Sequence, residues 1–529
     1  MASAVVALGP TLVRAEVDEP AASDETPRLI VLISVDQLGS ELFTRMQPTF
    51  SGGFRLLLDR GTEFRKAEYR HAKTETAPGH ATIATGTHPS RHGIIGNWWL
   101  ERGDPEELLS VDDEQYDKSP HKLVRSTLGD WLKDHAETAK VIAASAKDRS
   151  AILLGGKSAD LAVWFDDESG RLVTSPYYAG ATWLESFDSR RLADEFFGRM
   201  WTPLPVPADE LERLEIEEVD RGPREHGFPH ASGPLDLAAA EDFYDGLWDS
   251  PWLDELIIRL ALEVMRTQDL GSDDAVDLLA LGFSASDSVG HDWGPNSREQ
   301  IDVMLRLDRL LGELFDQIDQ TVGLGRTIVA LTSDHGSVPA PEVRQKRGEK
   351  GEAPGAETVQ CIQSVGRRLA EAHGVERWLV AGPFLDNDLE KLTGLSRKEL
   401  ELRTAAAAEE CPSVARVWTR GELMNGDAGD VTQQLFANSF FADRSPDFLI
   451  QFDEYFMTSR SMFTTHGTVY PYDRRVPILI MAPGVLAGPV NRPVAPIDIA
   501  PTLAALAGVP YPDDLDGTDL TRLLTRTAD

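Results

Sequence analysis

Four runs of mostly apolar residues stand out along the chain, each bounded by polar or turn-forming residues. They occupy positions 28–35, 277–284, 327–332 and 476–481. Nearly uninterrupted runs of this kind are typical of strands buried on both faces of a sheet. Between the second and third runs, residues 297–319 place apolar side chains three and four positions apart, as one face of a helix does. This strand–helix–strand order predicts an α/β protein with a central, mostly parallel sheet flanked by helices.

Three stretches depart from this rhythm. Residues 98–260 are rich in aromatic side chains, and we interpret them as an insertion that forms a cap. Residues 341–429 begin with the charged, glycine-rich RQKRGEKGEAPGAE, which predicts an exposed loop followed by a small α/β subdomain. Residues 1–27 combine a mostly small and apolar segment with an acidic one. They resemble the remnant of a signal peptide, without its basic region, and a disordered tail. We therefore expect one large domain over 28–529.

Composition narrows the possible partners. The 529 residues carry a formal net charge of −35, which argues against binding to nucleic-acid backbones. No run reaches the roughly 18 uncharged apolar residues of a membrane span. A phosphorylated substrate would be repelled at long range, so local cations would have to attract it. The sequence contains no pattern that indicates the oligomeric state.

The two cysteines, Cys361 and Cys411, are too few for a cysteine-rich zinc site. A disulfide in an exported protein and two buried thiols are both compatible with the sequence.

Carboxylates and imidazoles follow three of the apolar runs. Each of these residues alone could be a helix cap or a satisfied core residue. Together, three carboxylates and three imidazoles suit two adjacent divalent cations. Zinc fits these ligand types best, and manganese, iron or calcium remain alternatives. The residues are Asp36, Asp287 and His291, Asp334 and His335, and the later His466.

A hydroxyl and a cationic pair complete the candidate chemistry. Thr76 precedes Ala-Pro-Gly-His, which reads as a turn into a helix whose first amides would stabilise negative charge. Thr74 is the competing nucleophile. Lys147 and Arg149 follow a predicted strand at 140–144. They are either ordinary surface charges or donors to a phosphate monoester, which carries one more anionic oxygen than a diester.

These motifs resemble the alkaline phosphatase superfamily, in particular the PafA-type alkaline phosphatases and the related nucleotide pyrophosphatase/phosphodiesterases. The resemblance runs from about residue 28 to the C-terminal segment, which implies an alkaline-phosphatase-like fold. It implies two Zn²⁺ ions, with Thr76 as the nucleophile bridging towards the second. It further implies that Asn97, Lys147 and Arg149 bind the phosphoryl group. The implied ligand sets are Asp287, His291 and His466 for one zinc, and Asp36, Asp334 and His335 for the other.

The resemblance implies a periplasmic or secreted alkaline phosphatase that hydrolyses small-molecule phosphate monoesters through a phosphothreonine. A phosphodiesterase or nucleotide pyrophosphatase is the alternative. The complete ligand set argues against a non-catalytic phosphate-binding protein.

Overall fold

The computed structural model describes residues 26–102, 104–178, 182–216, 227–231, 240–348, 355–380, 382–425, 429–457 and 462–525. Almost all of the predicted N-terminal tail, residues 1–27, lies outside these ranges.

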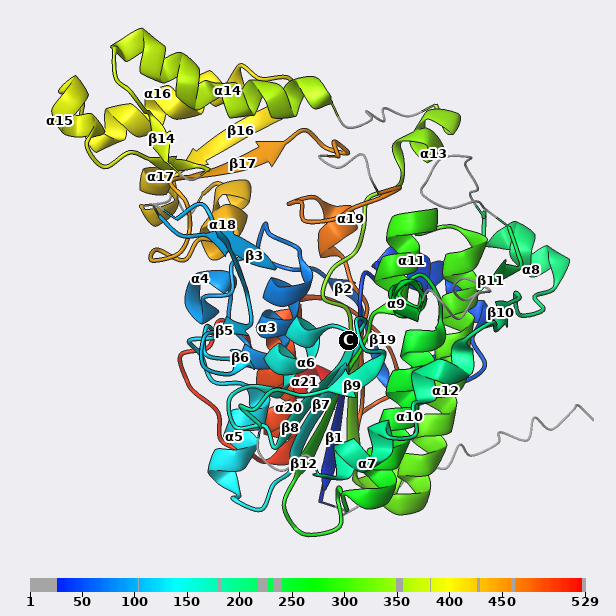
Figure 1. Ribbon diagram of the computed structural model, residues 1–529. Helices are drawn as coiled ribbons and strands as arrows, with labels where there is room; N and C mark the ends of the chain where they lie inside the picture. Colours follow the sequence, from blue (N-terminus) through cyan, green and yellow to red (C-terminus); the bar gives the residue numbers. More distant parts are fainter. Residues whose placement is uncertain are drawn as a thin grey trace, which may run out of the picture.

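A mixed sheet of nine strands forms the centre of the molecule, in the order β19-β2-β18-β13-β1-β12-β7-β8-β9. The five neighbours β13, β1, β12, β7 and β8 are parallel, while β18 and β9 run antiparallel to the strands beside them. The predicted α/β class with a mostly parallel sheet is confirmed (Figure 1). The strands are β1 (Leu29–Val35), β2 (Thr62–Ala67), β7 (Val141–Ser145), β8 (Leu161–Asp166), β9 (Arg171–Val173), β12 (Asp277–Phe283), β13 (Thr327–Thr332), β18 (Ile478–Met481) and β19 (Gly488–Val494).

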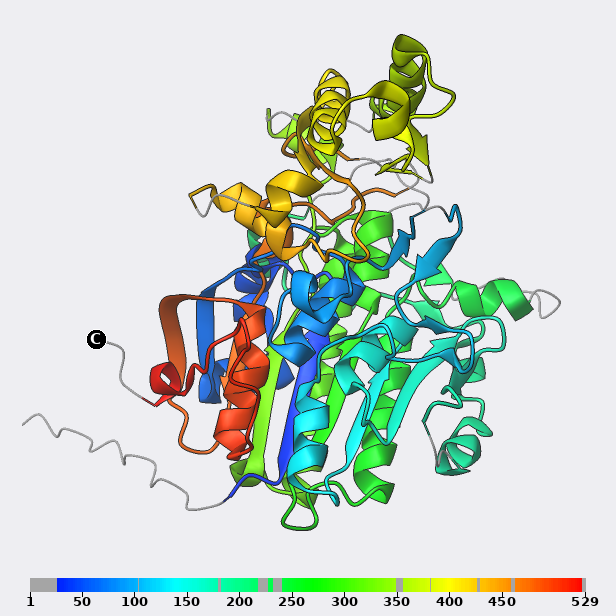
Figure 2. The same cartoon turned by 90° about the vertical axis from the view of Figure 1, so that its left-hand side faces the viewer.

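Helices cover both faces of this sheet. Helices α10 (Trp252–Thr267) and α12 (Arg298–Thr321) lie on one face. Helices α5 (Leu128–His135), α6 (Asp148–Gly155) and α20 (Ile499–Ala507) lie on the other, which faces the viewer in Figure 2. The predicted helix at 297–319 is α12. The Ser297 hydroxyl caps it by accepting from the Gln300 N–H.

A buried carboxylate fixes the packing of α12 against α2 (Gly53–Arg60). Asp308 accepts the backbone N–H groups of Ser51 and Gly52 at 2.7 Å and that of Phe54 at 2.8 Å. These amides belong to the first turn of α2 and the residues before it, where helix N–H groups have no partner within the helix. The side chain thus satisfies a buried helix start and joins two distant segments.

The structure revises the predicted extent of the cap. Residues 98–260 include β7, β8 and β9 of the central sheet, together with α5, α6 and α10 beside it. Trp164 and Phe165 are buried in the main hydrophobic core. The aromatic residues predict a cap, but in this segment they pack against the sheet. The antiparallel pair β10 (Met200–Trp201) and β11 (His230–Ala231) is tied to α12, because the Trp201 indole N–H donates to Asp302 at 2.6 Å.

A smaller unit with its own hydrophobic core stands above the sheet in Figure 1. It contains α14 (Ala356–His373), α16 (Arg397–Glu409) and the antiparallel pair β16 (Val414–Thr419) and β17 (Phe448–Phe452), so it continues beyond residue 429. Cys361 and Cys411 form a disulfide in it, which decides between the two alternatives left open by the sequence.

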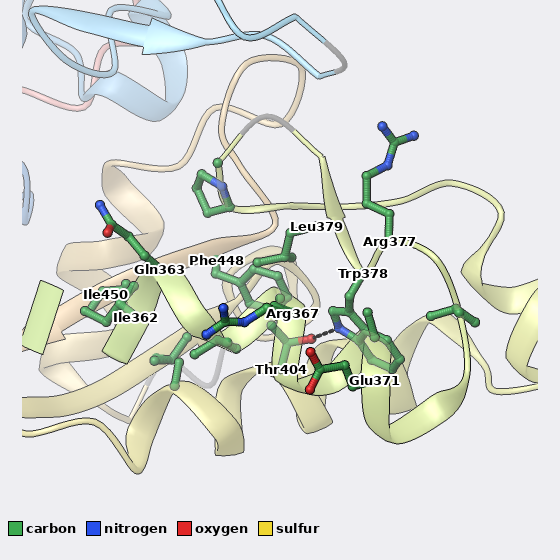
Figure 3. Close-up of a pocket in the computed structure, with 18 of the residues that line it drawn as sticks. Ile362, Gln363, Arg367, Glu371, Arg377, Trp378, Leu379, Thr404, Phe448 and Ile450 are labelled. Atoms are coloured by element: carbon green, nitrogen blue, oxygen red, sulfur yellow. Dashed lines mark hydrogen bonds between the residues drawn. The ribbon is translucent and has the colours of Figure 1, made fainter. Parts of the chain in front are cut away.

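This unit also holds an apolar cavity of about 720 Å³. Val365 and Phe448 line it, and the Trp378 indole N–H donates to the Thr404 hydroxyl at its wall (Figure 3). None of its lining residues belongs to the candidate metal ligands.

Among the described residues, no helix is both long and apolar enough to cross a membrane.

Candidate metal and phosphate site

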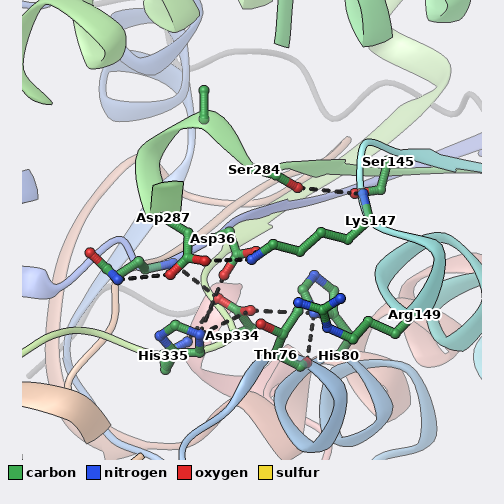
Figure 4. Close-up of polar contacts among 12 residues, drawn as sticks. Asp36, Thr76, His80, Ser145, Lys147, Arg149, Ser284, Asp287, Asp334 and His335 are labelled. Atoms are coloured by element: carbon green, nitrogen blue, oxygen red, sulfur yellow. Dashed lines mark hydrogen bonds and ion pairs between the residues drawn. The ribbon is translucent and has the colours of Figure 1, made fainter. Parts of the chain in front are cut away.

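Four neighbouring strands end at one edge of the sheet, and each delivers a charged side chain there. In sheet order, β13 leads to Asp334, β1 to Asp36, β12 to Asp287 and β7 to Lys147. Carboxyl ends of parallel strands meet at a single edge, which is where open α/β sheets bind ligands. The four side chains converge in Figure 4.

Helix α11 (Ala285–Trp293) begins directly after β12 and carries two of the candidate ligands. Asp287 lies in its first turn and His291 one turn later, so both share a face. The start of the helix is held by Asp254 of α10, which accepts the Ser284 and Ala285 N–H groups at 3.0 and 3.1 Å. Burial raises the pKa of Asp254 to about 7.

Hydrogen bonds fix the orientation of all three candidate histidine ligands. The Nδ1 atoms of His291, His335 and His466 lie 2.8–2.9 Å from the carbonyl oxygens of Thr464, Gly336 and Thr74. A carbonyl can only accept, so each Nδ1 carries the proton and each Nε2 offers a lone pair. Burial lowers the pKa of His335 and of His466, which favours the neutral imidazole that a metal requires.

Two sets of three ligand atoms lie close enough to hold a cation. Asp287, His291 and His466 form one set, and Asp36, Asp287 and His335 form the other, with atoms within 4.8 Å of one another in each. Asp287 thus belongs to both. Asp334 adjoins the second set, with its Oδ2 3.5 Å from the His335 Nε2.

Several of these atoms have no hydrogen-bond partner in the part of the chain that the structure describes. They are Asp36 Oδ1, Asp334 Oδ2 and His335 Nε2, all buried. Buried polar atoms are almost always satisfied, so a cluster of unpaired acceptors calls for a cation. The donor set therefore fits the two divalent metals that the sequence predicts.

Lys147 is the buried cation of this cluster. Its ammonium pairs with Asp36 and lies 2.5 Å from the Asp287 Oδ2. Burial opposes the charge of Asp287, but Lys147 and His291 outweigh it and hold the pKa of this carboxyl well below its ordinary value. Burial likewise opposes the Lys147 charge, but Asp287 and Asp36 raise the pKa of the ammonium. Arg149 lies in the first turn of α6, for which Lys147 is the N-cap.

Thr76 is the first residue of α3 (Thr76–Thr85), and it is buried. The helix packs against α6 and against Asp334. A Cβ on Gly79 would lie 2.4 Å from the Asp334 carbonyl oxygen, so only glycine permits this approach. His80 Nδ1 lies 2.8 Å from the Thr76 carbonyl oxygen and 3.4 Å from Asp334 Oδ2. The hydroxyl of the competing Thr74 already donates to the Thr468 carbonyl at 2.8 Å.

Asn97 is tied to the start of α3 from two sides. Its side-chain oxygen accepts the Ala77 N–H at 2.8 Å, and its own backbone N–H donates to Glu75 at 2.9 Å. With the oxygen used in this way, the NH₂ group is the donor that the Asn97 side chain can offer to a ligand.

The structure thus brings Asp36, Asp287, Asp334 and the three histidines together, with Lys147 among them. Thr76 begins the adjoining helix α3, and Asn97 is hydrogen-bonded to the first turn of that helix. Sequence reasoning did not assign roles to Gln37, Glu75 or Asp254. Gln37 and Glu75 adjoin residues that were singled out. Asp254 lies on a distant helix, and no motif marks it.

Known proteins resemble this chain in both sequence and fold. The family model for type I phosphodiesterase / nucleotide pyrophosphatase matches residues 30–465. The chain is 28% identical over 526 residues to alkaline phosphatase PafA of Elizabethkingia meningoseptica, covering 94% of this chain and 95% of that one. It is 31% identical over 528 residues to alkaline phosphatase PhoK of a Sphingomonas species, covering 93% and 90%. The crystal structure of wild-type PafA superposes with a TM-score of 0.84 at 26% identity, over 94% of this chain and 99% of that one.

Proposed function

The chain belongs to the type I phosphodiesterase/nucleotide pyrophosphatase family, and we propose that it is an alkaline phosphatase, a metal-dependent hydrolase of phosphate monoesters. The observation that carries the monoester assignment is the position of Lys147. Its ammonium is buried among the carboxylates at the strand ends, with Arg149 two residues further along. Cationic donors favour a phosphoryl group with three anionic oxygens over one with two.

The proposed ligands divide between two cations. Asp287, His291 and His466 would hold one, and Asp36, Asp334 and His335 the other, with Asp287 near enough to contact both. When bound there, two divalent cations, Zn²⁺ by ligand type, would stabilise the phosphoryl charge and lower the pKa of the Thr76 hydroxyl.

Thr76 is the proposed nucleophile. Its oxygen forms a bond to phosphorus while the bond between phosphorus and the ester oxygen breaks. The ester oxygen leaves as part of the alcohol product, and a phosphothreonine remains. The oxygen of a water molecule then forms a bond to phosphorus, the bond to Thr76 breaks, and inorganic phosphate is released. At the start of α3 the Ala77 N–H is donated to Asn97 and Pro78 has no N–H, so it is the positive end of the helix dipole that would favour the developing negative charge. The Asn97 NH₂, Lys147 and Arg149 donate to the phosphoryl oxygens.

A phosphodiesterase is the second candidate, because the matching family model carries that description. The deciding experiment compares kcat/KM for an aryl phosphate monoester and the matching diester, with protein saturated in Zn²⁺. The proposal requires the monoester to be preferred by at least tenfold. A preference for the diester would replace it with the phosphodiesterase reading.

We further propose that the protein is exported. The signal-like segment in the first 27 residues and the Cys361–Cys411 disulfide both suit an oxidising compartment. Cell fractionation tests this, and activity confined to the cytoplasm would contradict it.

A further inference from the structure

Gln37 follows Asp36 at the end of β1 and has an unusual backbone conformation. Its φ is +63°, in the left-handed region that residues with a Cβ rarely adopt and glycine adopts freely. Glycine would relieve the strain at this position. A glutamine that keeps this strained conformation suggests that its side-chain contacts have a function.

The contacts of Gln37 join two candidate ligands from different strands. Its side-chain Nε2 donates to Asp287 Oδ1 at 2.7 Å, and its backbone N–H donates to Asp334 Oδ1 at 3.2 Å. The residue is only 2% exposed. One buried residue therefore holds one oxygen of each carboxylate.

These bonds orient the carboxylates. Asp287 Oδ1 lies 3.2 Å from the His291 Nε2 and 3.6 Å from the His466 Nε2, while its Oδ2 points to Lys147. A carboxylate oxygen has two lone pairs, so Oδ1 can accept from Gln37 and still bind a cation. At Asp334 the second oxygen remains near His335.

A glycine inside α11, Gly290, lies against the side-chain amide of Gln37. A Cβ on Gly290 would lie 2.0 Å from the Gln37 Oε1. Glycine is disfavoured inside a helix, yet here it leaves room for the amide. A strained glutamine and an interior helix glycine thus fit one another beside Asp287.

We propose that Gln37 is a positioning residue of the metal centre, whose neutral side-chain amide sets the orientation of Asp287. A neutral amide fixes a ligand without cancelling the negative charge that the cations need, as partners outside the ligand shell commonly do. This inference rests on the proposed metal centre and assigns Gln37 and Gly290 a part in it.

The test is Zn²⁺ affinity, measured by competition with a chromophoric chelator. Gln37→Gly should weaken Zn²⁺ binding by about 10- to 100-fold. Urea unfolding of the metal-free variant should show that the fold is retained, because the relief that glycine gives at a φ of +63° partly offsets the loss of the buried amide. Asp269→Gly is the matched control. Asp269 also has a positive φ, of 51°, but is exposed beyond α10, so this change should leave Zn²⁺ affinity unaltered.

A second variant distinguishes a loss of the Gln37 orientation from a general disturbance of the fold. Gly290→Ala should also weaken Zn²⁺ binding, because its Cβ displaces the Gln37 amide. The double variant Gln37→Gly/Gly290→Ala should bind Zn²⁺ no more weakly than Gln37→Gly alone, since the obstructed side chain is gone.

The outcomes distinguish this role from the proposed function. Wild-type protein that binds no Zn²⁺ would overturn the metal centre and the role of Gln37 together. Wild-type binding with Gln37→Gly within about threefold of it would remove only the role of Gln37. Losses that add in the double variant would show that Gln37 and Gly290 act independently, which also contradicts the proposal.

Discussion

Replacing Lys147 and Arg149 together by alanine should cost monoester turnover far more than diester turnover. A charge-assisted hydrogen bond contributes about 1.5–3 kcal/mol. The Lys147 side chain is 7% exposed, which favours the upper end of that range, and the Arg149 side chain is 28% exposed, which favours the lower end. Losing both should raise the barrier for a monoester by about 4–5 kcal/mol, or roughly three orders of magnitude in kcat/KM. A diester has one anionic oxygen fewer and should lose about tenfold.

The assay measures kcat/KM for an aryl monoester and the matching diester, together with inhibition by inorganic phosphate, which should weaken. Zinc content must be measured as well, because Lys147 also pairs with two candidate ligands. Lys133→Ala is the control, since it breaks an exposed ion pair with Asp160 that should contribute little. Equal losses on both substrates, with full zinc content, would refute the role of the pair in selecting monoesters.

Three further changes probe separate parts of the site. Thr76→Ala should abolish turnover while zinc content and fold persist, and Thr76→Ser should keep partial activity; an alanine variant within about tenfold of wild type would exclude Thr76 as nucleophile. Exhaustive EDTA treatment should abolish activity, and Zn²⁺ should restore it. Full activity in protein shown to be metal-free would contradict the two-metal centre. Burial raises the pKa of Asp254 from 3.8 to about 7, so the folded state holds its proton more tightly and loses stability as pH rises between these values. Asp254→Asn should therefore stabilise the metal-free protein, by about 3 kcal/mol more near pH 8 than near pH 5 in urea unfolding, whereas a pH-independent difference would contradict this.

The apolar runs were sufficient to predict the central strands, because β1, β12 and β13 are buried on both faces. The fourth apolar run predicts a strand from residue 476, whereas β18 begins at Ile478, after Pro477, which has no N–H to donate. The edge strand β19 and its neighbour β2 escaped prediction. The first contains two prolines, and four of the six residues of the second are polar. Their pairing is set by tertiary contact, which local patterns do not record.

The sequence predicted most residues of the candidate site, but not the hydrogen bonds that connect them. Charged residues after apolar runs marked Asp36, Asp287 and Asp334, because parallel strands bring their ends together. The position of Asp287 between both ligand sets depends on how α11 packs, which spacing alone does not determine. Gln37 and Asp254 act through hydrogen bonds across long sequence separations, so no local motif identifies them.

Trapping the covalent intermediate tests the central claim most directly. Zinc-saturated wild-type protein would be mixed with a phosphate monoester, quenched in acid and analysed by peptide mass spectrometry. A phosphoryl group on Thr76, absent from Thr76→Ala and lost when the quench is delayed until substrate is exhausted, is the predicted result. Rapid monoester hydrolysis with the phosphoryl group on another residue would contradict the assignment of Thr76.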